Sequence, residues 1–78
     1  MLEKNRYVRR KVDSRKGTIE GSCIEGERLQ YLFCYDPRFL DALPDSYVFE
    51  DEVEPFDRPT DDEVEEINSF IKRGSEGG

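Results

Sequence analysis

The segment LQYLFCY (Leu29–Tyr35) decides the fold of this chain. Six of its seven residues are apolar or aromatic, which is typical of a β-strand inside a sheet that is covered on both faces. Asp36 and Pro37 follow it and are expected to end the strand, because proline lacks the backbone N–H that a neighbouring strand needs. A β-sheet built around residues 29–35 is therefore the predicted centre of the molecule.

Short apolar runs separated by turn residues continue on both sides of this segment, at a spacing typical of a small all-β protein. The expected further strands are YVRRKV (7–12), GTIEGSCI (17–24), SYVFE (46–50) and EVEPF (52–56). Gly21 stands inside the second of these and predicts a bulge that bends the sheet toward a barrel. The expected fold is mainly β, with five strands and a hairpin loop at residues 25–28.

A tight hairpin that pairs Ile24 with Leu29 predicts the register of the two central strands. In that register Cys34 lies opposite Ile19 and four ladder steps from Cys23, roughly 13 Å away at ~3.3 Å per residue. A disulfide needs Cα atoms within about 7 Å of each other. We therefore expect two reduced thiols that are mostly buried.

An amphipathic helix is expected after the strands, at residues 60–73. Thr60 and Glu63 form a capping box, in which each side chain accepts a hydrogen bond from the backbone N–H of the other residue. Gly74 stands where a C-cap is expected. A helix of this length is marginal alone, so its apolar stripe is expected to dock on the sheet or on a partner. The stripe consists of Val64, Ile67, Phe70 and Ile71.

Length and composition limit the chain to one small domain. It has 78 residues, 12 basic and 19 acidic side chains and a net charge of −7, and a domain of this size has no room for a deep substrate cleft. The expected parts are an N-terminal arm (1–5), a β domain (6–57), the helix and a disordered tail (74–78). No apolar run is long enough to span a membrane and no signal peptide is recognisable, so an intracellular location, cytoplasmic or nuclear, is expected.

The residue types present exclude several kinds of catalytic and metal site. The chain has no histidine, so a Ser–His or Cys–His pair cannot form. Cys23 and Cys34 lie among apolar and acidic neighbours, which raise the pKa of a thiol, and their spacing does not make a zinc site. The acidic residues show no EF-hand spacing. A noncatalytic protein without metal or cofactor is expected.

Charge is segregated along the chain, with basic residues gathered near the N-terminus and acidic ones in the C-terminal half. Tyr7, Arg9 and Lys11 share one face of the first expected strand, where an aromatic ring beside two cations can contact nucleic acid. Arg15 and Lys16 extend this set. Because the net charge is −7, nucleic-acid affinity is expected to be weak, and we favour neutralisation of these cations by the acidic half of the chain.

Aromatic residues at the ends of two expected strands predict a binding site for a protein partner. Tyr35 and Tyr47 lie beside Asp36 and Asp45, where their rings are expected to stay partly exposed, and Phe49 alternates with Tyr47. An aromatic pair next to a carboxylate can hold a cation or an arginine-bearing peptide. These five residues are the predicted partner-binding site.

Four segments together resemble SH3-like small β-barrels of the Tudor type: YVRRKV (7–12), GTIEG (17–21), YLFCYD (31–36) and YVFEDEVEPFD (47–57). The resemblance covers residues 6–57 and implies a five-stranded barrel. In Tudor readers of methylated lysine or arginine, an aromatic cage falls where this chain has Tyr35 and Tyr47, with Asp36 or Asp45 beside it. The first expected loop lacks the aromatics of such a cage, and RFLDALPDS separates the two tyrosines. Plain protein contact is therefore the expected use of the barrel.

The expected function is a noncatalytic protein-interaction module that serves as an accessory or regulatory part of a nucleic-acid-handling assembly. The alternative is an acidic inhibitor of the phage type, which presents carboxylates where a host nuclease or defence enzyme expects phosphates. The acidic surface of this alternative consists of Glu50, Asp51, Glu52 and Glu54. The oligomeric state stays open.

Overall fold

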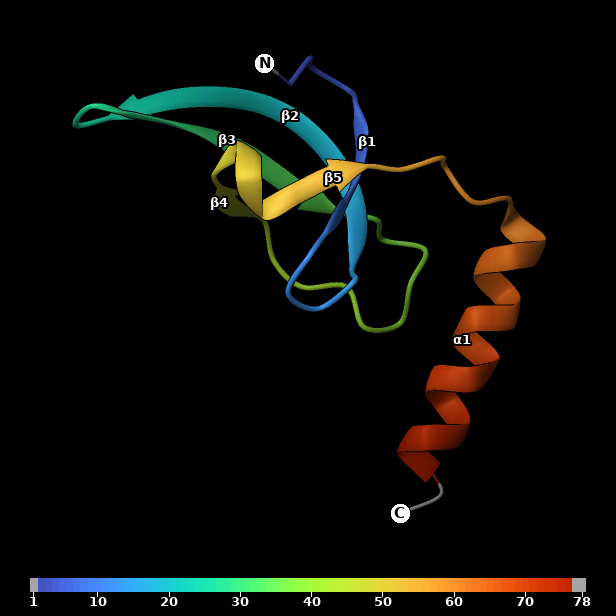
Figure 1. Ribbon diagram of the computed structural model, residues 1–78. Coiled ribbons are helices and arrows are strands. Elements are labelled where there is room, and N and C mark those ends of the chain that lie inside the picture. The colour runs from blue at the N-terminus through green and yellow to red at the C-terminus, as the bar shows by residue number, and fades with distance from the viewer. Residues whose placement is uncertain (1, 77–78) are drawn as a thin grey trace.

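Five antiparallel strands form one curved sheet in the computed structural model, which describes residues 2–76 (Figure 1). The order in the sheet is β4-β3-β2-β1-β5, so β1 and β5, the first and last strands along the chain, are neighbours. The edge strands β4 and β5 do not pair, and the sheet is not closed. The predicted mainly β fold with five strands and a C-terminal helix is confirmed. The elements are β1 (Tyr7–Arg10), β2 (Lys16–Glu25), β3 (Arg28–Tyr35), β4 (Ser46–Val48), the 3-10 turn η1 (Glu50–Glu52), β5 (Val53–Pro55) and α1 (Asp61–Glu76).

The β2–β3 hairpin sets the register of the sheet. Ile24 lies opposite Leu29, as predicted. Farther from the turn, the pairing shifts by one residue between Ile19 and Gly21. This shift is the predicted bulge, and β2 bends strongly along its length in Figure 1.

The bulge changes the surroundings of the cysteines. Beyond it Cys34 lies opposite Thr18, and Ile19, the predicted partner, faces Phe33 instead. Cys23 and Cys34 are both free thiols, as predicted, but each is half-buried and not mostly buried. The reason is that both lie on the outer face of the sheet, opposite to the core, because side chains alternate between the two faces of a strand.

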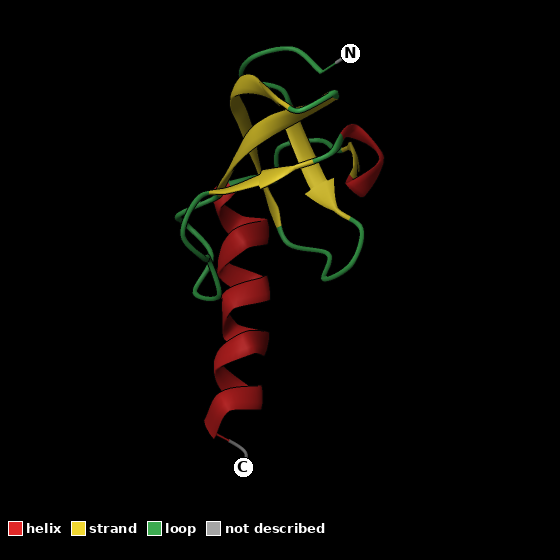
Figure 2. Cartoon of the chain, turned by 90° about the vertical axis from the view of Figure 1, so that its left-hand side faces the viewer, coloured by secondary structure: helices red, strands yellow, loops and turns green. Residues whose placement is uncertain are grey.

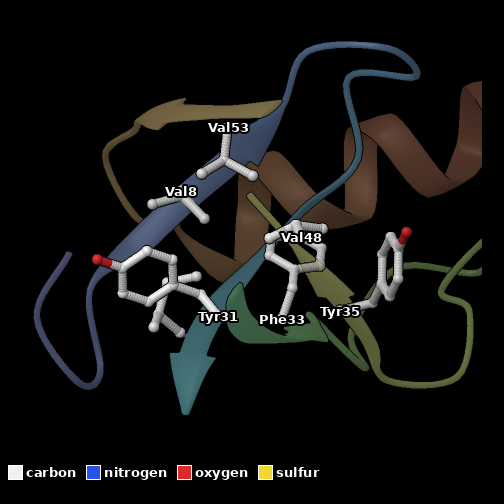
Figure 3. Close-up of a cluster of buried hydrophobic side chains, with 7 residues drawn as sticks. Val8, Tyr31, Phe33, Tyr35, Val48 and Val53 are labelled. Atoms are coloured by element: carbon white, nitrogen blue, oxygen red, sulfur yellow. The ribbon is translucent and has the colours of Figure 1, made fainter. Parts of the chain in front are cut away.

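The hydrophobic core covers one face of the sheet (Figure 3). Phe33 is fully buried, and its ring meets that of Tyr35 edge to face with 4.7 Å between the centroids. Leu32 and Cys34 alternate with these rings and are only half-buried. The prediction that β3 is covered on both faces is therefore wrong. Buried and half-buried side chains alternate along the strand, although nearly all of them are apolar. The other core residues are Val8, Ile19, Tyr31, Val48 and Val53.

α1 begins with the predicted capping box and runs further than predicted. The Glu63 N–H donates to Thr60 Oγ1 over 3.2 Å, and the Thr60 N–H donates to Glu63 Oε1 over 3.4 Å. Gly74, the predicted C-cap, lies inside the helix, which ends at Glu76. Because Gly74 does not adopt the positive φ of a C-cap, the helix continues past it. Of the predicted tail, residues 74–76 are thus helical, and residues 77–78 lie outside the described residues.

The N-terminal arm belongs to the folded unit. Leu2 packs against the hydrophobic core, and its backbone N–H donates a hydrogen bond to the hydroxyl of Tyr31 over 3.2 Å. The N–H of Asn5 donates to the carbonyl of Ile19, and Asn5 has a φ of 70°, in the left-handed region that asparagine tolerates. The described part of the arm therefore contacts both β2 and β3.

Gly17 is the position where the β2–β3 pair has no room for a side chain. A Cβ atom on Gly17 would lie 2.2 Å from the carbonyl oxygen of Cys34, whereas a Cβ on Gly21 would meet nothing within 4 Å. We expect Gly17→Ala to lower the free energy of unfolding by about 1–3 kcal/mol, through overpacking. Gly21→Ala is the matched control and should change it by less than about 0.5 kcal/mol. Urea unfolding measures both, and equal midpoints for the two variants would contradict the close approach at Gly17.

Candidate functional site

The segment between β3 and β4, residues 36–45, is fixed at its start by the buried carboxylate of Asp36, which is 5% exposed. This carboxylate accepts hydrogen bonds from the Tyr7 hydroxyl over 2.8 Å and from Arg38 Nη2 over 2.8 Å. The Arg38 backbone N–H donates to the other carboxylate oxygen over 3.0 Å. The backbone N–H of Asp36 donates to the carbonyl of Lys16 over 2.8 Å. Asp36 therefore binds β1 and Arg38 through its carboxylate, and it binds β2 through its backbone N–H.

These contacts shift the titration of all three groups. Burial opposes ionisation of Asp36, but hydrogen bonds from Arg38 and Tyr7 outweigh it and hold the pKa of the carboxyl below its usual value. Burial, together with the hydrogen bond to Asp36, raises the pKa of Tyr7 well above that of a free tyrosine. Hydrogen bonds to Asp36 and Asp61 raise the pKa of Arg38. The site is thus a carboxylate, a neutral phenol and a cation at neutral pH.

Arg38 connects this buried site to the helix. Its Nη1 atom donates to Asp61 Oδ1 over 2.9 Å, at the first residue of α1. Asn68, two turns further along α1, accepts a hydrogen bond from the Leu40 N–H over 2.9 Å. The Asn68 amide also donates to the Arg38 carbonyl over 2.7 Å. Val64 lies between these two anchors and is buried, so the N-terminal half of α1 is held against residues 36–45, which lie beside it in Figure 1.

A groove of about 420 Å³ runs between this segment and α1, and we call it the loop–helix groove. Leu40 lines it from the loop side and is 64% exposed, and Leu43 on the same segment is 43% exposed. Phe39, between them and Asp36, is buried. The groove therefore combines a fixed backbone with the exposed side chain of Leu40, and Leu43 is exposed on the same segment beyond the groove lining. Its lining includes Arg38, Leu40, Val64, Asn68, Ser69 and Lys72.

The predicted aromatic site does not come together. Tyr35 points into the core and is buried, and its hydroxyl accepts a hydrogen bond from Arg10. Tyr47 is exposed and lies opposite Leu32, on the outer face of the sheet. The two rings thus lie on opposite faces and cannot form one cage, because β4 pairs with β3 in the register that separates them.

The remaining members of that prediction are also dispersed. Asp36, expected beside exposed rings, is buried among its donors, whereas Asp45 is exposed. The guanidinium of Arg28 lies over the ring of Phe49, 3.6 Å from its centroid, and Phe49 is half-buried. Phe49 therefore already has a cationic partner within the chain.

The predicted basic face is largely occupied by contacts within the chain. Tyr7, expected on the surface, is buried, because Asp36 binds its hydroxyl and Arg58 lies over its ring at 4.9 Å. Arg9 forms an ion pair with Glu54 and lies over the ring of Phe56. These contacts remove the ring and one cation from the predicted nucleic-acid face.

The other cations of this face differ among themselves. Arg15 pairs with Asp13 at 3.0 Å and with Asp41 at 3.4 Å. The ammonium of Lys16 lies 5.3 Å from the centroid of the Phe39 ring. The side chain of Lys11 is exposed. Arg15 is thus paired with one carboxylate from each half of the chain.

The predicted acidic surface at residues 50–54 is also partly used inside the fold. Glu52 accepts a hydrogen bond from the Phe49 N–H over 2.8 Å, and Glu54 pairs with Arg9. Glu50 accepts a hydrogen bond from the Tyr31 hydroxyl over 3.3 Å. Asp51, in the middle of η1, is exposed. The row of four therefore does not present four free carboxylates to solvent.

Three further observations concern chemistry and membranes. Burial, together with a hydrogen bond to Asp45, raises the pKa of the Cys34 thiol to about 11, so it is protonated at neutral pH. Within residues 2–76, no group of three or more acidic or cysteine side chains is placed to hold a metal ion. No helix in the same range is both long enough and apolar enough to cross a membrane.

Sequence reasoning missed the loop–helix groove, because residues 38–44 fall between the expected strands 29–35 and 46–50 and no element was assigned to them. A signal for it was present. Four of the six residues between Pro37 and Pro44 are apolar, Leu40 and Leu43 among them, and a largely apolar connection usually has a packing or binding role. No sequence pattern predicted that the side chain of Asn68 would hydrogen-bond to the backbone of Arg38 and Leu40.

We expect Asp36→Asn to remove part of the acid dependence of stability. A carboxylate whose folded pKa is lowered stabilises the fold above its unfolded value of about 3.9, and this contribution is lost as pH falls through the folded value. The wild-type chain should therefore lose stability below about pH 5. Asp36→Asn should be about 1–3 kcal/mol less stable at neutral pH and should depend less on pH.

Asp61→Asn is the matched control, because it removes the other carboxylate held by Arg38, and that side chain is 92% exposed. Its free energy of unfolding should stay close to that of the wild type, since exposed ion pairs contribute little. Urea unfolding at a series of acidic and neutral pH values measures both variants. Identical curves for the two would show that Asp36 is not the compensated buried charge.

Comparisons of the chain with protein-family models, with curated proteins and with solved structures give no match.

Proposed function

We propose that this chain is a noncatalytic protein-interaction module whose partner binds in the loop–helix groove. The observation that carries the proposal is the pair of exposed leucines, Leu40 and Leu43, on a segment whose backbone is held by α1 and by the core. Exposed apolar side chains on a fixed backbone are typical of binding sites, because little conformational entropy is lost when a partner covers them.

The backbone contacts along this segment support such preorganisation. The Phe39 N–H donates to the Asp36 carbonyl and the Ala42 N–H donates to the Phe39 carbonyl, each over 3.2 Å. Asn68 holds the backbone of Leu40 from the other side. Leu40 is therefore displayed by a chain that is hydrogen-bonded on both flanks, and Leu43 directly follows the hydrogen-bonded Ala42, while Phe39 anchors the segment in the interior.

We further propose that the sheet is a small SH3-like barrel of the Tudor type. Two features support this finer assignment: β1 lies between β2 and β5, which brings the first and last strands together, and β2 bends at its bulge. This fold presents its connecting segments at the ends of the sheet, and residues 36–45 are one of them.

The acidic-inhibitor function is a second candidate, and α1 provides its favouring observation. The first two turns of the helix carry exposed carboxylates on Asp62, Glu63, Glu65 and Glu66. A partner that recognises these charges should be released steeply by added salt, whereas a partner held by Leu40 and Leu43 should not.

The decisive variant is the double substitution Leu40→Asp with Leu43→Asp. Immobilised wild-type chain and variant are compared for capture of proteins from the source cells by quantitative mass spectrometry, after a circular dichroism spectrum shows that the variant is folded. We expect the specific partner to be captured about tenfold less, because two central apolar contacts are lost. The salt dependence of capture is measured in parallel.

Ile24→Asp is the matched control, since Ile24 is 73% exposed at the tip of the β2–β3 hairpin, away from the groove. It should capture the partner as the wild type does. Equal capture by the groove variant and the wild type would rule out the groove as the binding site. Capture that is lost in added salt and is unchanged by the leucine substitutions would favour the acidic-inhibitor function.

A further inference from the structure

α1 extends well beyond the part of the chain that holds it. The hydrogen bonds and ion pairs described above join it to residues 36–45 through Asp61 and Asn68, both in its N-terminal half. The C-terminal half projects away from the sheet in both views (Figures 1 and 2). A short helix is only marginally stable in water without packing, so this half of α1 is the element with the least support.

Beyond the buried Val64, the apolar stripe continues from Ile67, at the end of the N-terminal half, into the projecting half, and we keep the name stripe for this part. Ile67, Phe70 and Gly74 follow one another at spacings of three and four residues, and Ile71 lies beside them, so the four share one face of the helix. Phe70 is 77% exposed, which is unusual for a phenylalanine on a helix surface. At 100° per residue the centre of this face lies about 110° around the helix axis from Asn68, which binds the loop. The stripe is therefore separate from the loop–helix groove.

Charge is arranged along α1 so that the helix complements itself in one orientation. The N-terminal half is acidic, and Lys72 and Arg73 follow in the C-terminal half. Two such helices placed side by side in parallel would bring like charges together. Placed antiparallel, the acidic half of each meets the basic end of the other, and the two helix dipoles also oppose each other favourably.

We propose that α1 pairs antiparallel with α1 of a second copy of this chain, through the stripe and about a two-fold axis near Phe70. Glu66 and Arg73 lie on the same flank of the stripe, seven residues apart, one position before Ile67 and Gly74 respectively. In an antiparallel pair centred near Phe70, Glu66 of one copy lies opposite Arg73 of the other, and this ion pair occurs twice by symmetry. A Cβ at Gly74 would meet nothing within 4 Å in the single chain, and its missing side chain lets the partner helix approach closely.

Only one helix from each copy contributes to this contact, so the dimer is expected to be weak, with a dissociation constant on the order of 100 μM. Its test is the mass of the intact chain by sedimentation equilibrium, from about 10 μM to about 1 mM, which brackets that value. The mass should rise from the 9.2 kDa of one chain toward twice that value. A mass that stays monomeric over the whole range, or that rises past the dimer, overturns the proposal.

Charge substitutions test the orientation. Glu66→Arg alone and Arg73→Glu alone should each weaken association at least about fivefold, since each places like charges opposite each other. The double variant Glu66→Arg with Arg73→Glu should restore it. Restoration separates a direct pair from a general charge effect, because Glu66→Arg by itself lowers the net repulsion between two acidic chains. Failure of the double variant to restore association overturns the antiparallel register.

The matched controls are Glu65→Arg and Lys72→Glu, which make the same charge changes on the groove side of the helix. They should associate as the wild type does. Phe70→Ser should abolish association and leave the fold intact, because this ring is exposed in the single chain. The variant with Asp at positions 40 and 43 should still dimerise, so loss of partner capture and loss of self-association remain separate results. Association that ignores Phe70→Ser would show that another surface forms the dimer.

Discussion

A carboxylate that is almost removed from water must find donors, and Asp36 at the end of β3 imposes this requirement on the whole molecule. Its donors come from β1, through Tyr7, and from Arg38 at the start of the next segment. Arg38 also donates to Asp61, the first residue of α1, so the side chain that compensates the buried charge lies next to the start of the helix. Because Asp61 is exposed, the helix is held mainly by the hydrogen bonds of Asn68 and by the burial of Val64. The loop–helix groove lies between the segment that begins at Asp36 and the helix held in this way.

Local patterns predicted most of the fold. The hairpin that pairs Ile24 with Leu29, the bulge beside Gly21 and the capping box at Thr60 each depend on a few neighbouring residues, and the structure confirms all three. Gly74 shows where a local rule was insufficient, since glycine ends a helix only when its φ is positive. The composition of β3 was misleading for a different reason. An apolar residue such as Leu32 is half-buried when its face of the sheet has only partial cover, and the sequence of the strand does not encode that cover.

The candidate site was harder to predict because its residues meet through contacts that are distant in sequence. Tyr35 and Tyr47 each lie where a strand was expected, yet the pairing of β4 with β3 places them on opposite faces of the sheet. Tyr7 was expected on the surface by strand alternation with Val8, and both are buried because chain outside the strand covers the second face. Asn68 reads as a polar position of an amphipathic helix, and its partner backbone lies 28 residues away. Each of these residues lies in the element predicted for it, and the error concerns only its contacts with other segments.

Ion pairs within the chain also limit which charged side chains remain on its surface to contact a partner. Arg9 and Arg15 are paired with carboxylates of the chain itself, so two of the four cations predicted for a nucleic-acid face already contribute to the fold, as Arg38 does through Asp36. Several large apolar side chains of the described residues stay exposed, and two of them, Leu40 on the loop and Phe70 on the helix, lie on the surfaces proposed for binding. In the functions proposed for this chain, recognition depends on these exposed apolar groups, while the charges along α1 set the orientation in which two helices would meet.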